Sequence, residues 1–101
     1  MAHKVTRIHK AGVTVCYMFF CPGCDHYHSF DVARWTFNGD VERPTFSPSL
    51  LCMYDSDELR CHLFVTDGSI QYCSDSKHHL SGQTVAMEDI DLPEDMERVG
   101  G

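Results

Sequence analysis

Residues 13–30, VTVCYMFFCPGCDHYHSF, contain the features that decide the fold. The first eight residues are mostly β-branched or aromatic, and they predict a largely buried strand. Cys21-Pro-Gly-Cys24 follows at once, and its proline and glycine favour a tight turn because proline presets φ and glycine adopts conformations that other residues resist. Residues 26–30 then alternate polar and aromatic side chains, as a half-exposed return strand does. Strand, cysteine-containing turn and strand together predict a zinc knuckle.

Further hairpins are predicted on the C-terminal side of the knuckle. Asn38-Gly39 lies between residues 35–37 and 41–42, and Asp67-Gly68 lies between residues 61–65 and 69–73. Both dipeptides favour the positive φ that a two-residue hairpin turn requires. The remaining segments are predicted as an extended connection between Pro44 and Pro48, strands at 50–54 and 84–87, and a polar loop at 75–82.

These segments predict one small zinc-binding domain that is all-β or β-dominated. It is expected to be built from antiparallel hairpins with little helix. The domain is expected to span residues 1–87. Residues 88–101 are acidic and end in Gly-Gly, which predicts a mobile C-terminal tail.

Composition and charge exclude several classes of protein. The chain has 101 residues, enough for one modest core. Its net charge of −7 and its scattered basic residues argue against binding to nucleic acid or to an anionic membrane. No apolar run approaches the roughly 20 residues that span a bilayer. The N-terminal residues lack the apolar core of a secretory signal, so we expect a cytoplasmic protein.

Six cysteines in a cytoplasmic chain of this length indicate metal binding more than disulfides. A secreted disulfide framework is the alternative, since six is an even number. A redox-active dithiol is disfavoured because no helix is predicted after the Cys-x-x-Cys pair. We therefore predict a structural zinc ion as cofactor.

Cys21 and Cys24 are the first two predicted metal ligands, because their spacing places two sulfurs on one side of a turn. Cys61 is the third candidate, since it begins a strand directly after a loop. His62 and His78 compete for the fourth position. Neighbours on a strand face opposite ways, so Cys61 and His62 are not expected to bind the same ion unless the strand starts irregularly.

The remaining candidates are placed around this site or in the core. His28 is expected to orient a ligand from behind, and Asp75 is a candidate for a role beside the metal. The cysteines within apolar strands and the other histidines are interpreted as structural or exposed residues: Cys16, Cys52, Cys73, His3, His9, His26 and His79.

No catalytic residue is predicted from sequence motifs. His-Glu-x-x-His, Gly-x-Ser-x-Gly and the deaminase signature are all absent. A metal site closed by four protein ligands is structural, whereas a catalytic site keeps one position for water. An open site beside His62, Asp75 or His78 would make the chain a small zinc-dependent hydrolase, and this alternative stays open.

The order of several short blocks resembles a family of small proteins from tailed bacteriophages and prophages that often carry the label ammonia monooxygenase. The resemblance covers roughly residues 16–86. The blocks are CPGC at 21–24, WTFNG at 35–39, RPTFSPS at 43–49, CHLFV at 61–65, DGSI at 67–70, SDSKH at 74–78 and LSGQTV at 80–85. The label itself does not fit, because ammonia oxidation is carried out by a membrane-bound, multi-subunit copper enzyme.

What the resemblance implies is a phage accessory protein made in the host cytoplasm of a bacterium. The positions that the family marks are Cys21, Cys24, Cys61, His62, Asp75 and His78. Relatives can carry a cysteine where this chain has Ser76, so that position is not an expected ligand.

The function predicted from these observations is a zinc-stabilised binding module that engages a host or defence protein. The alternatives are the zinc-dependent hydrolase and a minor virion or assembly component.

Overall fold

The computed structural model describes residues 3–53 and 59–98, and within these ranges it contains nine strands and no α-helix. The strands form two sheets, with the orders β3-β2-β1-β9 and β4-β5-β6-β7-β8. The predicted all-β fold is confirmed. No helix in the described part of the chain is long and apolar enough to cross a membrane.

The first sheet is built around the cysteine-containing turn. β1 (Val5–Lys10) pairs with β2 (Val13–Cys21), and β2 pairs with β3 (His26–Asp31), both antiparallel. The knuckle predicted from residues 13–30 is therefore present as two paired strands and their turn. Its backbone closes with a bond from Asp25 N–H to the Cys21 carbonyl (2.8 Å), and Asp25 takes a positive φ of 59°.

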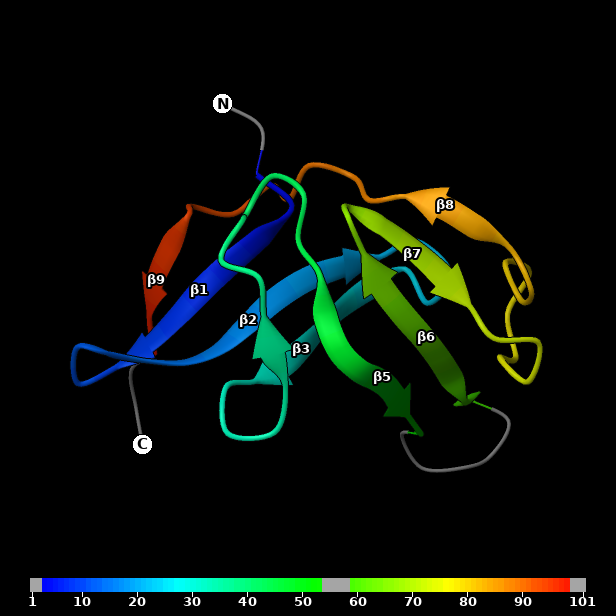
Figure 1. Cartoon of the computed structure of the whole chain (residues 1–101), viewed down its shortest axis with the longest axis horizontal. Coiled ribbons are helices and arrows are strands. Elements are labelled where there is room, and N and C mark those ends of the chain that lie inside the picture. Colours follow the sequence, from blue (N-terminus) through cyan, green and yellow to red (C-terminus); the bar gives the residue numbers. More distant parts are fainter. Residues whose placement is uncertain (1–2, 54–58, 99–101) are drawn as a thin grey trace.

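The second sheet is an antiparallel meander of five strands. They are β4 (Thr36–Phe37), β5 (Phe46–Cys52), β6 (Cys61–Thr66), β7 (Ser69–Tyr72) and β8 (Thr84–Ala86). The predicted hairpin at Asp67-Gly68 joins β6 to β7, and both turn residues have positive φ. In Figure 1 β2 and β3 extend behind β5 and β6, so the two sheets share one core.

That core is aromatic where the sheets meet. Phe30 of β3 stacks on Phe46 of β5, with ring centroids 4.1 Å apart and planes within 4° of parallel. Phe19 stacks on Phe30 from the β2 side, and Leu63 and Ile70 are fully buried on the facing sheet. These bulky side chains give a small domain enough buried area to fold.

The prediction of a hairpin at Asn38-Gly39 is wrong. β4 pairs with β5 instead of with residues 41–42. The Asn38 side-chain oxygen accepts bonds from the backbone N–H groups of Asp40 (3.2 Å) and Thr45 (3.1 Å). The Asn38 side chain therefore stabilises a wider loop. Asparagine tolerates the positive φ of a tight turn, but its side chain can also accept bonds from nearby backbone N–H groups, and here it does the latter.

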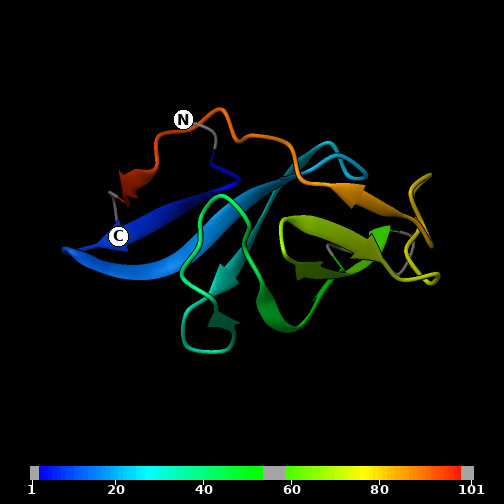
Figure 2. The ribbon, with the colours of Figure 1, turned by 45° about the horizontal axis from the view of Figure 1, so that its top comes forward.

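Residues 88–98 were predicted as part of a mobile tail, but the structure packs them onto the first sheet. Ile90 is buried, and β9 (Asp95–Glu97) runs parallel to β1. Figures 1 and 2 show the segment after β8 crossing from the second sheet to the first. Its acidic residues meet basic partners, and the ion pairs are Lys4–Asp89, Arg7–Glu94 and His9–Asp95.

Candidate functional site

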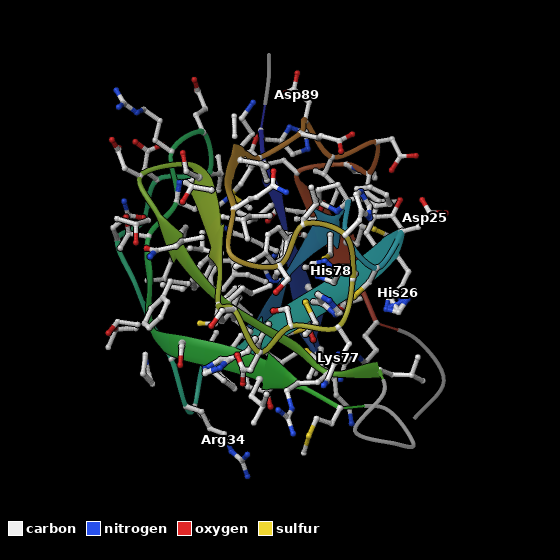
Figure 3. The ribbon with its side chains drawn as sticks, turned by 90° about the vertical axis from the view of Figure 1, so that its right-hand side faces the viewer. Asp25, His26, Arg34, Lys77, His78 and Asp89 are labelled. Carbon is white, nitrogen blue, oxygen red and sulfur yellow. The ribbon has the colours of Figure 1, made fainter. Side chains whose placement is uncertain are left out.

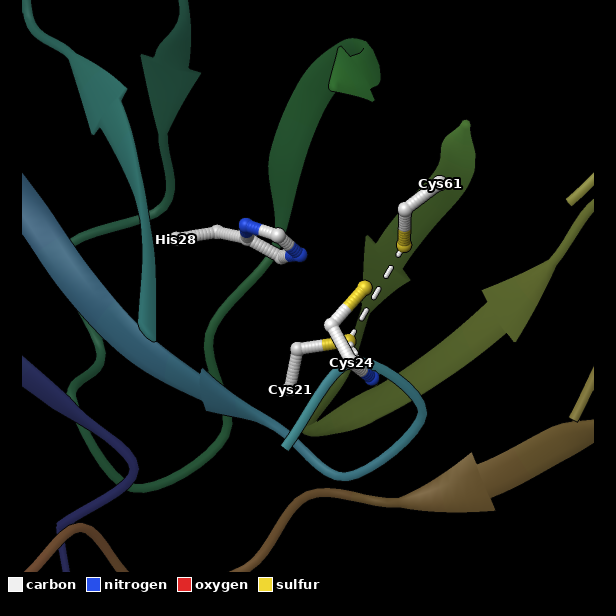
Figure 4. Close-up of side chains that lie close together, drawn as sticks. All are labelled: Cys21, Cys24, His28 and Cys61. Carbon is white, nitrogen blue, oxygen red and sulfur yellow. Dashed lines mark hydrogen bonds between the residues drawn. The ribbon is translucent and has the colours of Figure 1, made fainter. Parts of the chain in front are cut away.

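Four side chains from three strands and one turn converge beside the cysteine-containing turn. Cys21 ends β2, Cys24 lies in the turn, His28 lies on β3 and Cys61 begins β6. One ligand atom from each lies within 4.8 Å of the others. In Figure 4 the three thiols point toward one another and the His28 ring is directed at them. We call these four residues the thiol cluster.

The thiol cluster has three buried members and a half-buried Cys24, and it concentrates negative charge. Cys21 and Cys61 are fully buried and their sulfurs are 3.9 Å apart. The contact with Cys61 lowers the pKa of Cys21 to about 3. Burial and the negative charge on Cys21 raise the pKa of Cys24 to about 11, and the contact with Cys21 raises the pKa of Cys61. A bound cation would compensate the charge that these thiols cannot all carry alone.

His28 contributes the nitrogen of the set. Burial opposes its protonation, but hydrogen bonds with the sulfurs of Cys21 and Cys52 raise the pKa of His28 to about 9. Three sulfurs and one imidazole nitrogen form a donor set that fits a tetrahedral metal ion. The thiol cluster can therefore hold a metal ion.

The structure places His78 against the thiol cluster without including it among the four. Its Nε2 lies 3.4 Å from the Cys61 sulfur, and its ring packs edge-on against Tyr72 with centroids 4.5 Å apart. A Cβ on Gly23 would lie 2.3 Å from the His78 ring. The glycine is thus required by the close approach of this ring, and burial lowers the pKa of His78.

His62 belongs to a different constellation. As strand alternation predicts, it faces away from the thiol cluster although its neighbour Cys61 is a member. Its Nε2 lies 3.2 Å from Ser49 Oγ, and its Nδ1 lies 3.2 Å and 3.3 Å from the two carboxylate oxygens of Asp75. A hydroxyl, an imidazole and a carboxylate connected in this order have the geometry of a Ser-His-Asp triad.

Strand pairing brings the first two members of this triad together. Phe46 pairs with Val65 and Leu50 with Leu63, so residues 47–49 of β5 bulge opposite a single residue of β6. The bulge ends at Ser49, whose carbonyl oxygen accepts a bond from Trp35 Nε1 (3.2 Å). His62 on the adjacent strand then lies within hydrogen-bond reach of the Ser49 hydroxyl.

The loop after β7 brings Asp75 to His62 and is fixed by Ser76. The buried Ser76 hydroxyl accepts a bond from the His62 N–H (3.0 Å) and donates one to the His62 carbonyl (2.9 Å). Arg60 Nη1 lies 3.7 Å from the Asp75 carboxylate, on the exposed side of this loop. These contacts hold the carboxylate on the Nδ1 side of the imidazole.

A cavity of about 350 Å³ lies beside the thiol cluster. It is lined by Gly23, Cys24, His26, Leu59, Arg60, Lys77 and His78. Figure 3 shows three of these side chains, His26, Lys77 and His78, on one face of the molecule. Arg60 and Lys77 are the two cationic side chains of this lining, and Arg60 is shared with the Asp75 carboxylate at 3.7 Å.

Sequence reasoning missed Ser49 altogether. It lies in no Gly-x-Ser-x-Gly motif, and nothing in its local sequence distinguishes it from Ser47. One signal in the sequence points toward it, because His62 and Asp75 are both candidate site residues there. A histidine and an aspartate that lie outside a closed metal site can instead activate a nucleophile, and a serine on a neighbouring strand would then be the residue to look for.

A family model described as "Bacterial ubiquitination-like system serine protease (BubE)" matches residues 2–73, which is more than half of the chain. The match includes Ser49 and His62 and ends two residues before Asp75. The chain matches no curated protein and no solved structure.

Proposed function

The chain belongs to the BubE family, and from this premise we propose that it is a serine peptidase with Ser49, His62 and Asp75 as its catalytic residues. The observation that carries the proposal is the continuous pair of contacts from the Ser49 hydroxyl through His62 to the Asp75 carboxylate. Both heavy-atom distances are 3.2 Å, within the reach required for proton transfer.

In this mechanism Ser49 Oγ attacks the carbonyl carbon of an amide bond while its proton moves to His62 Nε2. The C–N bond then breaks, and the amine leaves with the proton that Nε2 had received. Water gives a proton to the same nitrogen and attacks the acyl-serine ester, which releases a carboxylic acid and restores the Ser49 hydroxyl. Asp75 keeps the proton of the neutral imidazole on Nδ1, so that Nε2 is free to accept one.

The thiol cluster supports this site from the other face of β6. We propose that it holds a structural zinc ion through Cys21, Cys24, His28 and Cys61, whose donor set is that of closed zinc sites. The ion supplies no chemistry to the reaction. It ties the turn between β2 and β3 to the first residue of β6, and the next residue of that strand is His62.

The family description supports a proposal for the class of substrate. Because that description names a bacterial ubiquitination-like system, the amide bond that we propose as substrate belongs to a protein of such a system. The cavity beside the thiol cluster is the docking surface that we propose for that substrate, with Lys77 available to a carboxylate of the docked segment. A host protein as partner and the bacterial cytoplasm as compartment stay predictions from the sequence.

A fluorophosphonate probe tests the nucleophile directly. The probe forms a phosphorus–oxygen bond with an activated serine and releases fluoride, so peptide mapping identifies the modified residue. We expect labelling at Ser49 in protein loaded with one zinc ion per chain, and none in Ser49→Ala. Ser47→Ala is the matched control, since Ser47 is exposed on the same strand and should leave labelling unchanged.

Two results would contradict the proposal. One is a folded wild-type chain that the probe does not modify, and the other is labelling of Ser49→Ala at the wild-type rate. Circular dichroism and the melting temperature of both variants exclude unfolding as the cause of lost labelling.

A further inference from the structure

A third donor lies beside the catalytic histidine and aspartate. One ligand atom each from His62, Cys73 and Asp75 lies within 4.8 Å of the others. The His62 nitrogen on the Asp75 side is Nδ1, since Nε2 is the atom that contacts Ser49. Cys73 follows the last residue of β7 and is half-buried, where the sequence predicted a core residue.

Backbone bonds fix the spacing of these three side chains. The Cys73 N–H donates to the His62 carbonyl (2.9 Å), which continues the β6–β7 pairing by one residue. Residues opposite each other in an antiparallel pair have side chains on the same face. The Ser76 N–H donates to the Cys73 carbonyl (3.1 Å), so the turn that carries Asp75 folds back on the same position.

We infer that His62, Cys73 and Asp75 form a second metal site, for a borderline-soft divalent cation such as Zn²⁺, and that its occupancy blocks the nucleophile Ser49. The inference rests on the proposed function, because the site shares His62 and Asp75 with the triad. Thiolate, imidazole and carboxylate are all ligands of zinc-like cations. Three protein ligands leave a coordination position for water, so this site is expected to bind more weakly than the four-ligand thiol cluster.

The block follows from the two nitrogens of the imidazole. A cation on Nδ1 uses the lone pair of that atom, and the single proton of neutral His62 then resides on Nε2. Nε2 can donate to Ser49 but can no longer accept its proton. The Asp75 carboxylate is drawn to the cation as well, and the thiol proton of Cys73 is released to solvent. Nothing is oxidised or reduced, and removal of the cation restores the triad.

The experiment uses protein loaded with one zinc ion per chain and titrated with Co²⁺. Cobalt reports a sulfur ligand by its thiolate charge-transfer absorption, and isothermal titration calorimetry reports how many ions bind. The rate of fluorophosphonate labelling at Ser49 is measured in the same samples. We expect wild-type protein to bind a second ion, to lose labelling in step with it, and to recover after a chelator removes that ion.

Cys73→Ser is the decisive variant, because it removes a ligand that the triad does not use. Loss of a residue that merely supports a metal ligand weakens binding by about 10–100-fold, so loss of the thiolate itself should raise the inhibitory concentration by at least ~10-fold. Labelling without added metal should match wild type. Ser74→Ala, an exposed neighbour in the same turn, should behave as wild type in every respect.

Three outcomes would overturn the inference: no second ion binds, the Cys73→Ser variant binds it equally well, or the ion binds while Ser49 labelling continues unchanged. Binding measured on Ser49→Ala separates this inference from the proposed function. If that variant and wild type both bind a second ion through Cys73, the metal site stands. Absence of labelling in wild type that holds only the structural zinc ion would then refute only the proposed peptidase and the inhibition that depends on it.

Discussion

The Ser76 hydroxyl links the loop that carries Asp75 to β6, the strand that carries His62. The variant Ser76→Ala tests how much this link contributes to stability and to the position of Asp75. The hydroxyl accepts from the His62 N–H and donates to the His62 carbonyl. In Ser76→Ala the His62 carbonyl loses its bond from Ser76 but keeps the one from the Cys73 N–H. The loss of the bond from Ser76 therefore costs about 1 kcal/mol. The N–H loses the acceptor that Ser76 supplies, and an unsatisfied buried donor costs about 1–3 kcal/mol.

Together the two losses lower the free energy of unfolding by about 2 kcal/mol. This value is at the low end of their sum because water can partly satisfy the N–H of the half-buried His62. For a domain of this size 1 kcal/mol shifts the melting temperature by about 4–8 °C, so we expect a decrease of roughly 10 °C. The measurement is thermal unfolding of zinc-loaded protein, followed by circular dichroism. The rate of fluorophosphonate labelling, measured well below the melting temperature, should also fall because Asp75 is held less firmly.

Ser76→Cys provides a graded comparison, since a thiol is a weaker donor and acceptor of similar shape. It should lie between wild type and Ser76→Ala in both measurements. Ser74→Ala controls for changes in the loop surface. If Ser76→Ala changes the unfolding free energy by less than ~0.5 kcal/mol and leaves labelling unchanged, Ser76 does not position the site.

Three other changes test the metal cluster, the triad and the packing between them. Cys24→Ser should give a largely unfolded chain, because structural zinc contributes on the order of 10 kcal/mol to folding; a wild-type melting temperature would contradict this. Asp75→Asn should reduce the labelling rate by roughly 10³–10⁴-fold without unfolding the chain, as loss of the correct imidazole tautomer does in serine proteases; a loss below ~10-fold would remove Asp75 from the triad. Gly23→Ala should destabilise the protein by about 1–3 kcal/mol in thermal melts, since its Cβ would overlap the His78 ring, and an unchanged melting temperature would show that this ring moves aside freely.

The parts of the fold that the sequence predicts are those with local causes. The strands around residues 13–30 and the hairpin at Asp67-Gly68 depend on short-range patterns, and both are confirmed. β9 depends on pairing with β1, which is more than 80 residues away along the chain. Its acidic composition resembles that of a solvated tail, and its pairing is supported by the ion pairs of Arg7 and His9 and by the burial of Ile90.

The candidate sites divide along the same line. Cys21 and Cys24 follow from their spacing and Cys61 from its place at the start of a strand, whereas His28, expected only to orient a ligand, enters the thiol cluster through the β2–β3 register. Ser49 could not be predicted from the sequence, because the bulge in β5 is what brings its hydroxyl to His62. A triad assembled from three separate segments has no fixed order or spacing in sequence, so its members are recognised only by geometry.

The adjacency of Cys61 and His62 makes β6 intolerant of any change in length. A strand alternates its faces at every residue, so one residue inserted between these two would turn the following side chains to the opposite side of the sheet. His62 would then point into the core, and Leu63 would take the face of the sheet that now carries His62. Insertions and deletions are therefore expected in exposed turns away from the site, such as Ala11-Gly12 between β1 and β2, while the dipeptide at 61–62 stays uninterrupted in any functional variant.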